Sequence, residues 1–193
     1  VRYFYEPIAV AEEQRGYQMR PHDFKLRYQN KRNEEPAMVS LAERLPDSRL
    51  THLIVINNDQ PSFEDYQDFF QSLIGSNVVE LDLGDSFVGP EEFELFLEVL
   101  PLTQLRSINF EQTNIDHDNI RGLAGVIHQT QIEELNLGGL RGEGVNFHVL
   151  LRALPGSNVR MLYLFDNDLQ PSTIQTLANI LPDTGISALD LSG

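Results

Sequence analysis

Histidine has the widest chemical use of the residue types in this sequence, since its imidazole can ligate a metal or transfer a proton near neutral pH. The five histidines are scattered, at His22, His52, His117, His128 and His148. None of them forms the H-E-x-x-H spacing that places two ligands on one helix face. The sequence has no cysteine, which excludes thiolate ligands, cysteine nucleophiles and disulfides within the chain. We therefore expect no metal centre and no cofactor.

Two short acidic segments invite interpretation as calcium sites: Asp116-His117-Asp118 and Asp166-Asn167-Asp168. Neither continues into the long calcium-binding loop with its central Gly and terminal Glu. Because both lie between an expected strand and an expected helix, they are better interpreted as turn formers and helix caps. The sequence also lacks a G-x-x-x-x-G-K-[ST] phosphate loop and a G-x-S-x-G nucleophile turn. We predict that the chain is not an enzyme.

The composition is that of a folded protein with a strong negative charge: 41% of the residues are hydrophobic, 22% are charged and the formal net charge is −15. A surface of this sign repels nucleic acid and anionic membranes, so both are poor partners. The charge either keeps the surface solvated or steers a basic protein toward it, and composition does not separate the two. No apolar run approaches the roughly 18 residues that cross a bilayer. The absence of cysteine permits a cytoplasmic location.

A hydrophobic frame recurs six times along the chain. It reads apolar-x-x-apolar-x-apolar, with one further position three residues later. Its copies contain Leu50, Leu53 and Val55; Val78, Leu81 and Leu83; Leu105, Ile108 and Phe110; Ile132, Leu135 and Leu137; Val159, Leu162 and Leu164; and Ile186, Leu189 and Leu191. The starts are separated by 28 residues once and by 27 residues four times. Chance clustering does not give such regular spacing, so a repeat array is predicted.

Each repeat is predicted to fold as a strand, a turn and a helix. Apolar residues two apart in a frame share one face of a strand, and stretches such as 120–127 between the frames have helical periodicity. Proline and acidic residues mark helix starts in Pro90-Glu91-Glu92 and Pro171-Ser172, and proline marks helix ends in Leu45-Pro46, Leu100-Pro101, Leu154-Pro155 and Leu181-Pro182. Such units must stack to bury their apolar faces, which predicts a parallel sheet with an outer helix layer. Helices are wider than strands, so we expect a curved stack with the strands on its concave side.

The segments Leu162-Tyr163-Leu164-Phe165-Asp166-Asn167-Asp168-Leu169 and Leu81-Asp82-Leu83 resemble the ribonuclease-inhibitor-like leucine-rich-repeat family. The resemblance implies an α/β fold, a right-handed α/β solenoid or leucine-rich-repeat horseshoe with a parallel concave sheet and convex helices. It covers residues 36–193, as about six strand-helix units. Members of such families act mostly as protein-binding scaffolds, and similar short arrays occur in innate-immune receptors, Ran GTPase activators and bacterial effectors delivered into host cells. The implied location is the cytoplasm, or the host cytoplasm for an effector.

The position three residues after each frame is usually Asn in this family, because its side chain bonds the backbone of the neighbouring turn. Asn58 and Asn167 conform, and Ser86 and Thr113 are weaker substitutes. Leu140 cannot form such a bond, so an irregular turn is expected there.

The two ends of the chain depart from the repeat. Residues 1–35 are expected to form an N-terminal cap region with a degenerate repeat, in which Leu26 and Tyr28 belong to a capping strand and the aromatic start covers the first repeat. The last frame stops at Gly193 without a polar cap, which favours a truncated array or a paired edge. The first residue, Val1, is not methionine, and a fragment or a processed chain is therefore expected.

The frame predicts which side chains point out of the concave sheet. Two groups of them are candidate partner-binding residues: an acidic stripe of Glu80, Asp82, Asp85, Glu111, Glu133 and Glu134, and an apolar cluster of Met161, Tyr163 and Phe165. Aromatic residues are enriched at interface hot spots, so Tyr163 and Phe165 are the expected anchors. In the alternative interpretation they stack on neighbouring strands or cover the free edge. The stripe either faces a basic partner or is a solvated surface.

We interpret the chain as a protein-protein interaction scaffold that binds another protein on its concave face, and a basic protein is one candidate. Two alternatives stay open at this point. One is activation of a GTPase in the manner of Ran GTPase activators, with Arg106 or Arg160 contacting the partner, and it rests on analogy of fold. In the other, the chain is the recognition part of a larger effector, receptor or enzyme.

Overall fold

The computed structural model describes residues 25–29, 37–56, 61–86, 88–142 and 144–193, with the side chains of 25–29, 37–40 and 56 left aside. The predicted aromatic cap at the start of the chain and the predicted ladder residue Asn58 lie outside the described residues. Within the described residues, no helix has the length and apolar character needed to cross a membrane.

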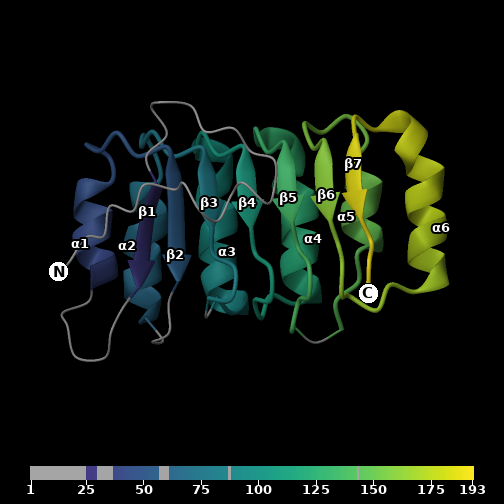
Figure 1. Ribbon diagram of the computed structural model, residues 1–193, viewed down its shortest axis with the longest axis horizontal. Helices are drawn as coiled ribbons and strands as arrows, with labels where there is room; N and C mark the ends of the chain where they lie inside the picture. Colours follow the sequence, from purple (N-terminus) through teal and green to yellow (C-terminus); the bar gives the residue numbers. More distant parts are fainter. Residues whose placement is uncertain (1–24, 30–36, 57–60, 87, 143) are drawn as a thin grey trace.

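In the part of the chain that the structure describes, seven parallel strands form one sheet, in which the order of the strands follows the order of the sequence (Figure 1). They are β1 Lys25–Gln29, β2 His52–Ile56, β3 Glu80–Asp82, β4 Ser107–Asn109, β5 Glu134–Asn136, β6 Met161–Tyr163 and β7 Ala188–Asp190. The central frame leucines or isoleucines pair in register, for example Leu81 with Ile108 and Leu135 with Leu162. The register of the sheet is therefore the repeat of the sequence. The predicted upstream strand also forms, since Leu26 in β1 pairs with Leu53 in β2.

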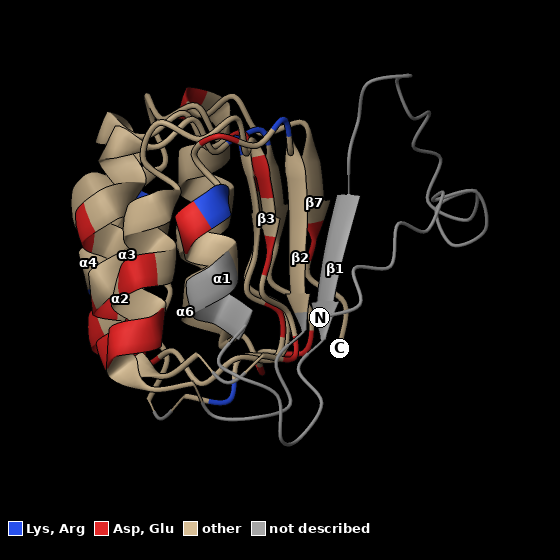
Figure 2. Ribbon diagram, turned by 90° about the vertical axis from the view of Figure 1, so that its left-hand side faces the viewer, with Lys and Arg blue, Asp and Glu red and all other residues tan. Residues whose placement is uncertain are grey.

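A helix follows each of the strands β1 to β6, and all of these helices lie on the same side of the sheet (Figure 2). They are α1 Ala37–Arg44, α2 Phe63–Ser72, α3 Pro90–Val99, α4 His117–Val126, α5 His148–Ala153 and α6 Pro171–Ile180. One turn of 3-10 helix extends α3, α4 and α6, at Leu100–Leu102, Ile127–Gln129 and Leu181–Asp183. The chain is thus an α/β fold of two layers, built from repeated strand-helix units.

The core lies between the two layers. The frame residues that point toward the helices are buried almost completely from β2 to β6; Leu53, Ile108, Leu135 and Leu162 are at most 1% exposed. Between α2, α3 and β4, phenylalanine rings fill the space in contact with one another, with centroids 5.3 Å apart for Phe70 and Phe96. Burial of such side chains stabilises a fold by about 2 kcal/mol each, so the alternation of the frame determines which face of the sheet receives the helices.

Short-range signals set the ends of the helices. Helices α3 and α6 begin at the predicted prolines Pro90 and Pro171, where the lack of an N–H costs nothing. A reciprocal cap starts α2, in which the backbone N–H of Asp65 donates to the Ser62 hydroxyl and the Ser62 N–H donates to the Asp65 carboxylate. The predicted proline stops at Pro101 and Pro182 lie inside the 3-10 turns, directly after the α-helical residues.

A hydroxyl residue two positions before each frame connects helix to strand, and the frame itself did not reveal it. The residues are Ser48, Ser76, Thr103, Thr130, Ser157 and Thr184. The Thr130 hydroxyl, for example, donates to the carbonyl of Ile127 at 2.8 Å and accepts from the N–H of Ile132 at 3.4 Å. One side chain therefore satisfies a carbonyl at the helix end and a donor at the strand start.

The expectation of an irregular turn at Leu140 is wrong. The residue before it, Gly139, has a φ of 59°, close to the 56° of Gln112 and the 53° of Asp166 at the matching positions. The turn is preserved because Asn167 of the following repeat reaches back to it. Its amide donates to the Leu137 carbonyl at 2.7 Å and accepts from the Leu140 N–H at 3.1 Å. The departure from the repeat comes later, where α5 starts at His148 instead of the matching position 144.

Candidate binding face on the open side of the sheet

The side of the sheet opposite the helices is here called the open face (Figure 2). From β3 to β6 the outward residues are partly exposed on both sides of a buried central residue. Glu80, Asp82, Glu134, Met161 and Tyr163 all belong to this set. The register on which the candidate residues were chosen is therefore correct. The structure does not test whether a partner binds them.

In the first half of the acidic stripe, each carboxylate has a neighbour within the chain. Glu80 lies 2.9 Å from Nε2 of His52 on β2, and the Nδ1 atom of that ring is 2.8 Å from the Thr51 hydroxyl. Asp82 accepts from the amide of Asn109 on β4 at 2.9 Å. Asp85, in the turn after β3, is exposed and lies 3.5 Å from the guanidinium of Arg141.

The second half of the stripe follows the same rule. Glu111 accepts from the amide of Asn136 at 3.4 Å, and Glu133 lies 3.4 Å from the guanidinium of Arg106. Glu134 is partly exposed on β5. The fold does gather the predicted carboxylates on one face. It also places amides, an imidazole and two guanidinium groups between them, and these reduce the mutual repulsion on which the expectation of a basic partner rested.

Acidic residues are not confined to the open face. Figure 2 shows acidic residues on the helices as well, and Glu64, Asp68, Glu91, Glu94 and Glu98 on α2 and α3 are exposed. This distribution fits a general solvated surface better than a charge focused on one site. The acidic stripe alone therefore does not single out a binding position.

Where it is Asp or Asn, the last residue of a strand, which lies outside the hydrophobic frame, forms a turn with the backbone that follows it on the open face. The side-chain oxygens of Asp82, Asn109, Asn136 and Asp190 each accept the backbone N–H two residues later, at 2.9 to 3.0 Å. These Asx turns hold the chain as it leaves the strand. Tyr163 occupies the matching position in β6, where a phenol cannot make this bond.

The cluster of Met161, Tyr163 and Phe165 lies together on the open face of β6 and the turn that follows. The Tyr163 hydroxyl is 4.0 Å from the sulfur of Met161. The Phe165 ring lies flat against Gly138 in the neighbouring repeat, where a Cβ would overlap Cζ, Cε1 and Cε2 of the ring. Phe165 therefore stacks on the neighbouring repeat, as the alternative interpretation expected, and stays partly exposed.

The two arginines of the GTPase alternative are both exposed. Arg106 is bound to Glu133, and Arg160 stands beside Gly185, with Nη1 3.2 Å from the place a Cβ would take. Their role in contacting a GTPase stays a prediction.

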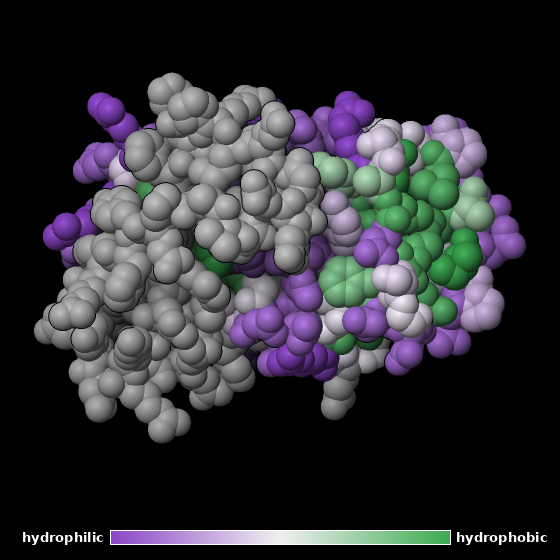
Figure 3. Space-filling model, viewed as in Figure 1, coloured by the Kyte–Doolittle hydropathy of each residue, from purple (hydrophilic) through white to green (hydrophobic). Residues whose placement is uncertain are grey.

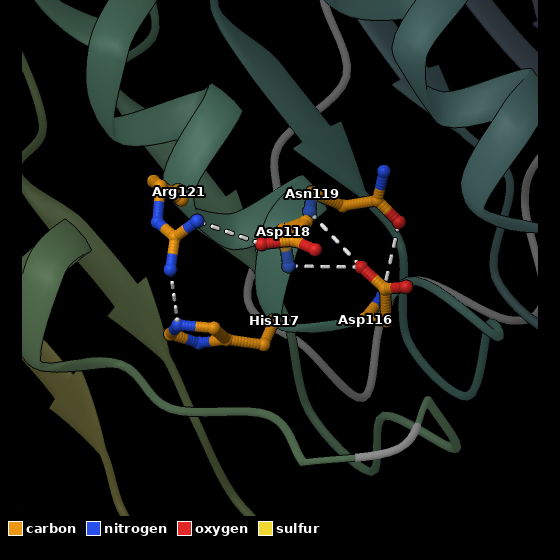
Figure 4. Close-up of polar contacts among 5 residues, drawn as sticks. All are labelled: Asp116, His117, Asp118, Asn119 and Arg121. Atoms are coloured by element: carbon orange, nitrogen blue, oxygen red, sulfur yellow. Dashed lines mark hydrogen bonds and ion pairs between the residues drawn. The ribbon is translucent and has the colours of Figure 1, made fainter.

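The acidic segment at the start of α4 is a helix cap, as predicted (Figure 4). The Asp116 carboxylate accepts the N–H groups of Asp118 and Asn119 at 2.9 and 3.1 Å, and the Asn119 amide oxygen accepts the Asp116 N–H at 3.0 Å. Arg121 bridges the Asp118 carboxylate and Nε2 of His117. Among the residues that the structure describes, no three His, Asp or Glu side chains are arranged to hold a metal ion.

Hydrophobic side chains gather at the end of the molecule that carries β7 and α6 (Figure 3). Leu189 is 37% exposed and Ile174 is 39% exposed, whereas the residues matching Leu189 in β2 to β6 are buried. On β7 itself, the Ser192 hydroxyl and N–H both donate to the Asp190 carboxylate, which lowers the pKa of that carboxyl below its ordinary value.

Comparison with known proteins gives a likeness in fold. No protein-family model matches the sequence, and no curated protein matches it. Among solved structures, the fold is similar to one titled "Leiomodin-1 Actin-Binding Site 2 (ABS2)", a leucine-rich-repeat-like fold. The TM-score is 0.61 at 15% sequence identity, over 76% of this chain and 87% of that chain. At this identity the likeness concerns the arrangement of strands and helices alone.

Proposed function

We propose that the chain is a leucine-rich-repeat solenoid that acts as a non-enzymatic scaffold and binds another protein on the concave, open face of its sheet. The observation that carries the proposal is the alternation of buried and exposed side chains along each strand. One set of side chains is sealed under the helices, and the other set differs from strand to strand on an accessible surface. Such a surface offers a partner a row of independently variable contacts at fixed spacing.

The anchor of the proposed interface is the cluster of Met161, Tyr163 and Phe165. Aromatic rings bury much area for little loss of side-chain freedom, and interface hot spots are enriched in them. Two of these residues share β6 and the third follows in its turn, so one partner surface can cover all three. The solved structure of similar fold supports the fold assigned here, and its title names an actin-binding site of that protein only.

The proposal is tested by affinity capture from cell extract, with the bound proteins identified by mass spectrometry. Wild-type protein is compared with the double variant Tyr163→Ala plus Phe165→Ala, and circular dichroism confirms that both are folded. The matched control is Phe63→Ala, which removes an aromatic side chain that is 45% exposed on α2, in the helix layer. We expect a partner that the control retains and the double variant loses. Equal recovery by all three proteins contradicts the proposed interface.

A further inference from the structure

Tyr163 stands where the fold favours a different residue. In β3, β4, β5 and β7 the matching residue is Asp or Asn, and its side chain closes the strand end by accepting an N–H. In β2 the matching residue is Ile54, which cannot accept this bond. At β6 the chain gives up that bond and presents a phenol on the open face. A position at which a repeat abandons its own structural rule is a candidate for function, because the local fold alone would select against it.

Met161 is the apolar neighbour of Tyr163 along β6. Across the sheet, Tyr163 pairs with Asp190 on β7 and with the neutral Asn136 on β5. Met161 lies two residues before Tyr163 on the same face, with its sulfur 4.0 Å from the Tyr163 hydroxyl. Glu134 of β5 is the register partner of Met161. Register partners in neighbouring strands are within side-chain reach of each other. The strip of ring and thioether is therefore bordered by one carboxylate on each side.

The stretch that follows Arg160 is acidic, and Arg160 itself is exposed beside Gly185. From Met161 to Gly193 the sequence contains four aspartates and no lysine or arginine. An apolar partner surface placed over the strip would remove water from the bordering carboxylates without replacing their hydrogen bonds, which is costly. A cation placed there would face the ring and the carboxylates together, and both interactions are favourable.

We infer that a basic side chain of the partner protein, an arginine or a lysine, binds on the surface formed by Met161, Tyr163, Asp190 and Glu134. The inference rests on the proposed function and specifies the partner's chemistry at that site. The cation lies over the Tyr163 ring, its charge is balanced by Asp190 and Glu134, and its alkyl stem packs on the Met161 thioether.

The test uses the whole chain and two tripeptides with blocked ends, Gly-Arg-Gly and Gly-citrulline-Gly, which differ in charge and little in shape. Their binding is followed by NMR through the Met161 methyl and Tyr163 ring signals. We expect saturable shifts with the arginine peptide and about two- to five-fold weaker binding of the citrulline peptide. Equal binding of the two peptides, or no saturable shift with either, overturns the inference.

Variants separate the contact from a purely structural role. Tyr163→Phe keeps the ring and should keep arginine binding, whereas Tyr163→Asn restores the residue type of the neighbouring strands and should fold but lose binding. Asp190→Asn should weaken the arginine peptide and leave the citrulline peptide unchanged. If the arginine peptide does not bind while Tyr163→Asn still abolishes partner capture, the inference fails and the proposed function stands. If the arginine peptide does not bind and Tyr163→Asn leaves partner capture unchanged, both the inference and the proposed function fail.

Discussion

The contact between Phe165 and Gly138 predicts that one substitution will change the sign of its effect when the residue facing it is removed. A Cβ added at Gly138 would lie closer to the Phe165 ring carbons than non-bonded carbons can approach, so Gly138→Ala must push the ring away. Overpacking of this kind costs about 1–3 kcal/mol. The smaller entropy of the unfolded alanine chain offsets only about 0.4–1 kcal/mol. We expect Gly138→Ala to lower the free energy of unfolding by about 1–2 kcal/mol.

With Phe165→Ala already present, the obstacle is gone and the entropy gain remains. Gly138→Ala should then raise the free energy of unfolding by about 0.4–1 kcal/mol. Denaturant unfolding of wild type, the two single variants and the double variant gives the coupling energy directly. The control is Gly125→Ala on α4, where an added Cβ meets nothing within 4 Å and should stabilise both backgrounds equally. Additive effects at Gly138 and Phe165 would refute the stacking of the ring.

Three further predictions follow from single positions. Leu162→Ala, at a fully buried frame residue, should cost about 2–5 kcal/mol in denaturant unfolding, while its outward neighbour Tyr163→Ala should cost about 1 kcal/mol; equal costs would place the register in error. Gln112 has a φ of 56°, and Gln112→Gly should raise the unfolding free energy by about 1 kcal/mol, whereas a loss would show that its side chain outweighs the strain. Ser192→Ala should raise the pKa of Asp190 in an NMR titration, because two donated hydrogen bonds disappear or weaken. Since the folded pKa is the lowered one, the stabilisation by Asp190 is present above its unfolded pKa and is lost as the pH falls through the folded value; an unchanged pKa in the variant would contradict this.

The spacing of the frame predicts most of the fold because burial enforces it. A shift of one residue in β3 or β5 would move Leu81 or Leu135 to the open face, so burial of the frame residues leaves one register. The helix starts at Pro90 and Pro171 were predictable for a similar reason, since only a first-turn position tolerates proline well. The same scan, extended two residues upstream, would also have found the hydroxyl that recurs before every frame, as at Thr130.

The features that the sequence did not reveal have a common physical origin: they concern bonds that cross from one repeat to the next. The turn at Leu140 was expected to fail because Leu140 has no polar group, yet the bond comes from Asn167 in the following repeat. The acidic stripe looked repulsive when its members were considered singly, but the sheet sets Arg106 beside Glu133. A frame aligned along the chain shows what each repeat contains. The contacts between repeats appear only when side chains one period apart are considered as pairs.

Consideration of pairs also narrows where specificity can lie on the open face. The last residue of a strand is engaged in an Asx turn wherever it is Asp or Asn, so positions such as Asn109 and Asn136 stabilise the fold as well as facing solvent. Substitutions there alter stability, which limits how freely they can vary for a partner. Residues at the start of a strand, such as Glu134 and Met161, do not form this Asx turn. If the chain acts as the proposed scaffold, it should recognise its partner through residues at strand starts, and through a strand end only where the side chain there makes no turn bond, as at Tyr163.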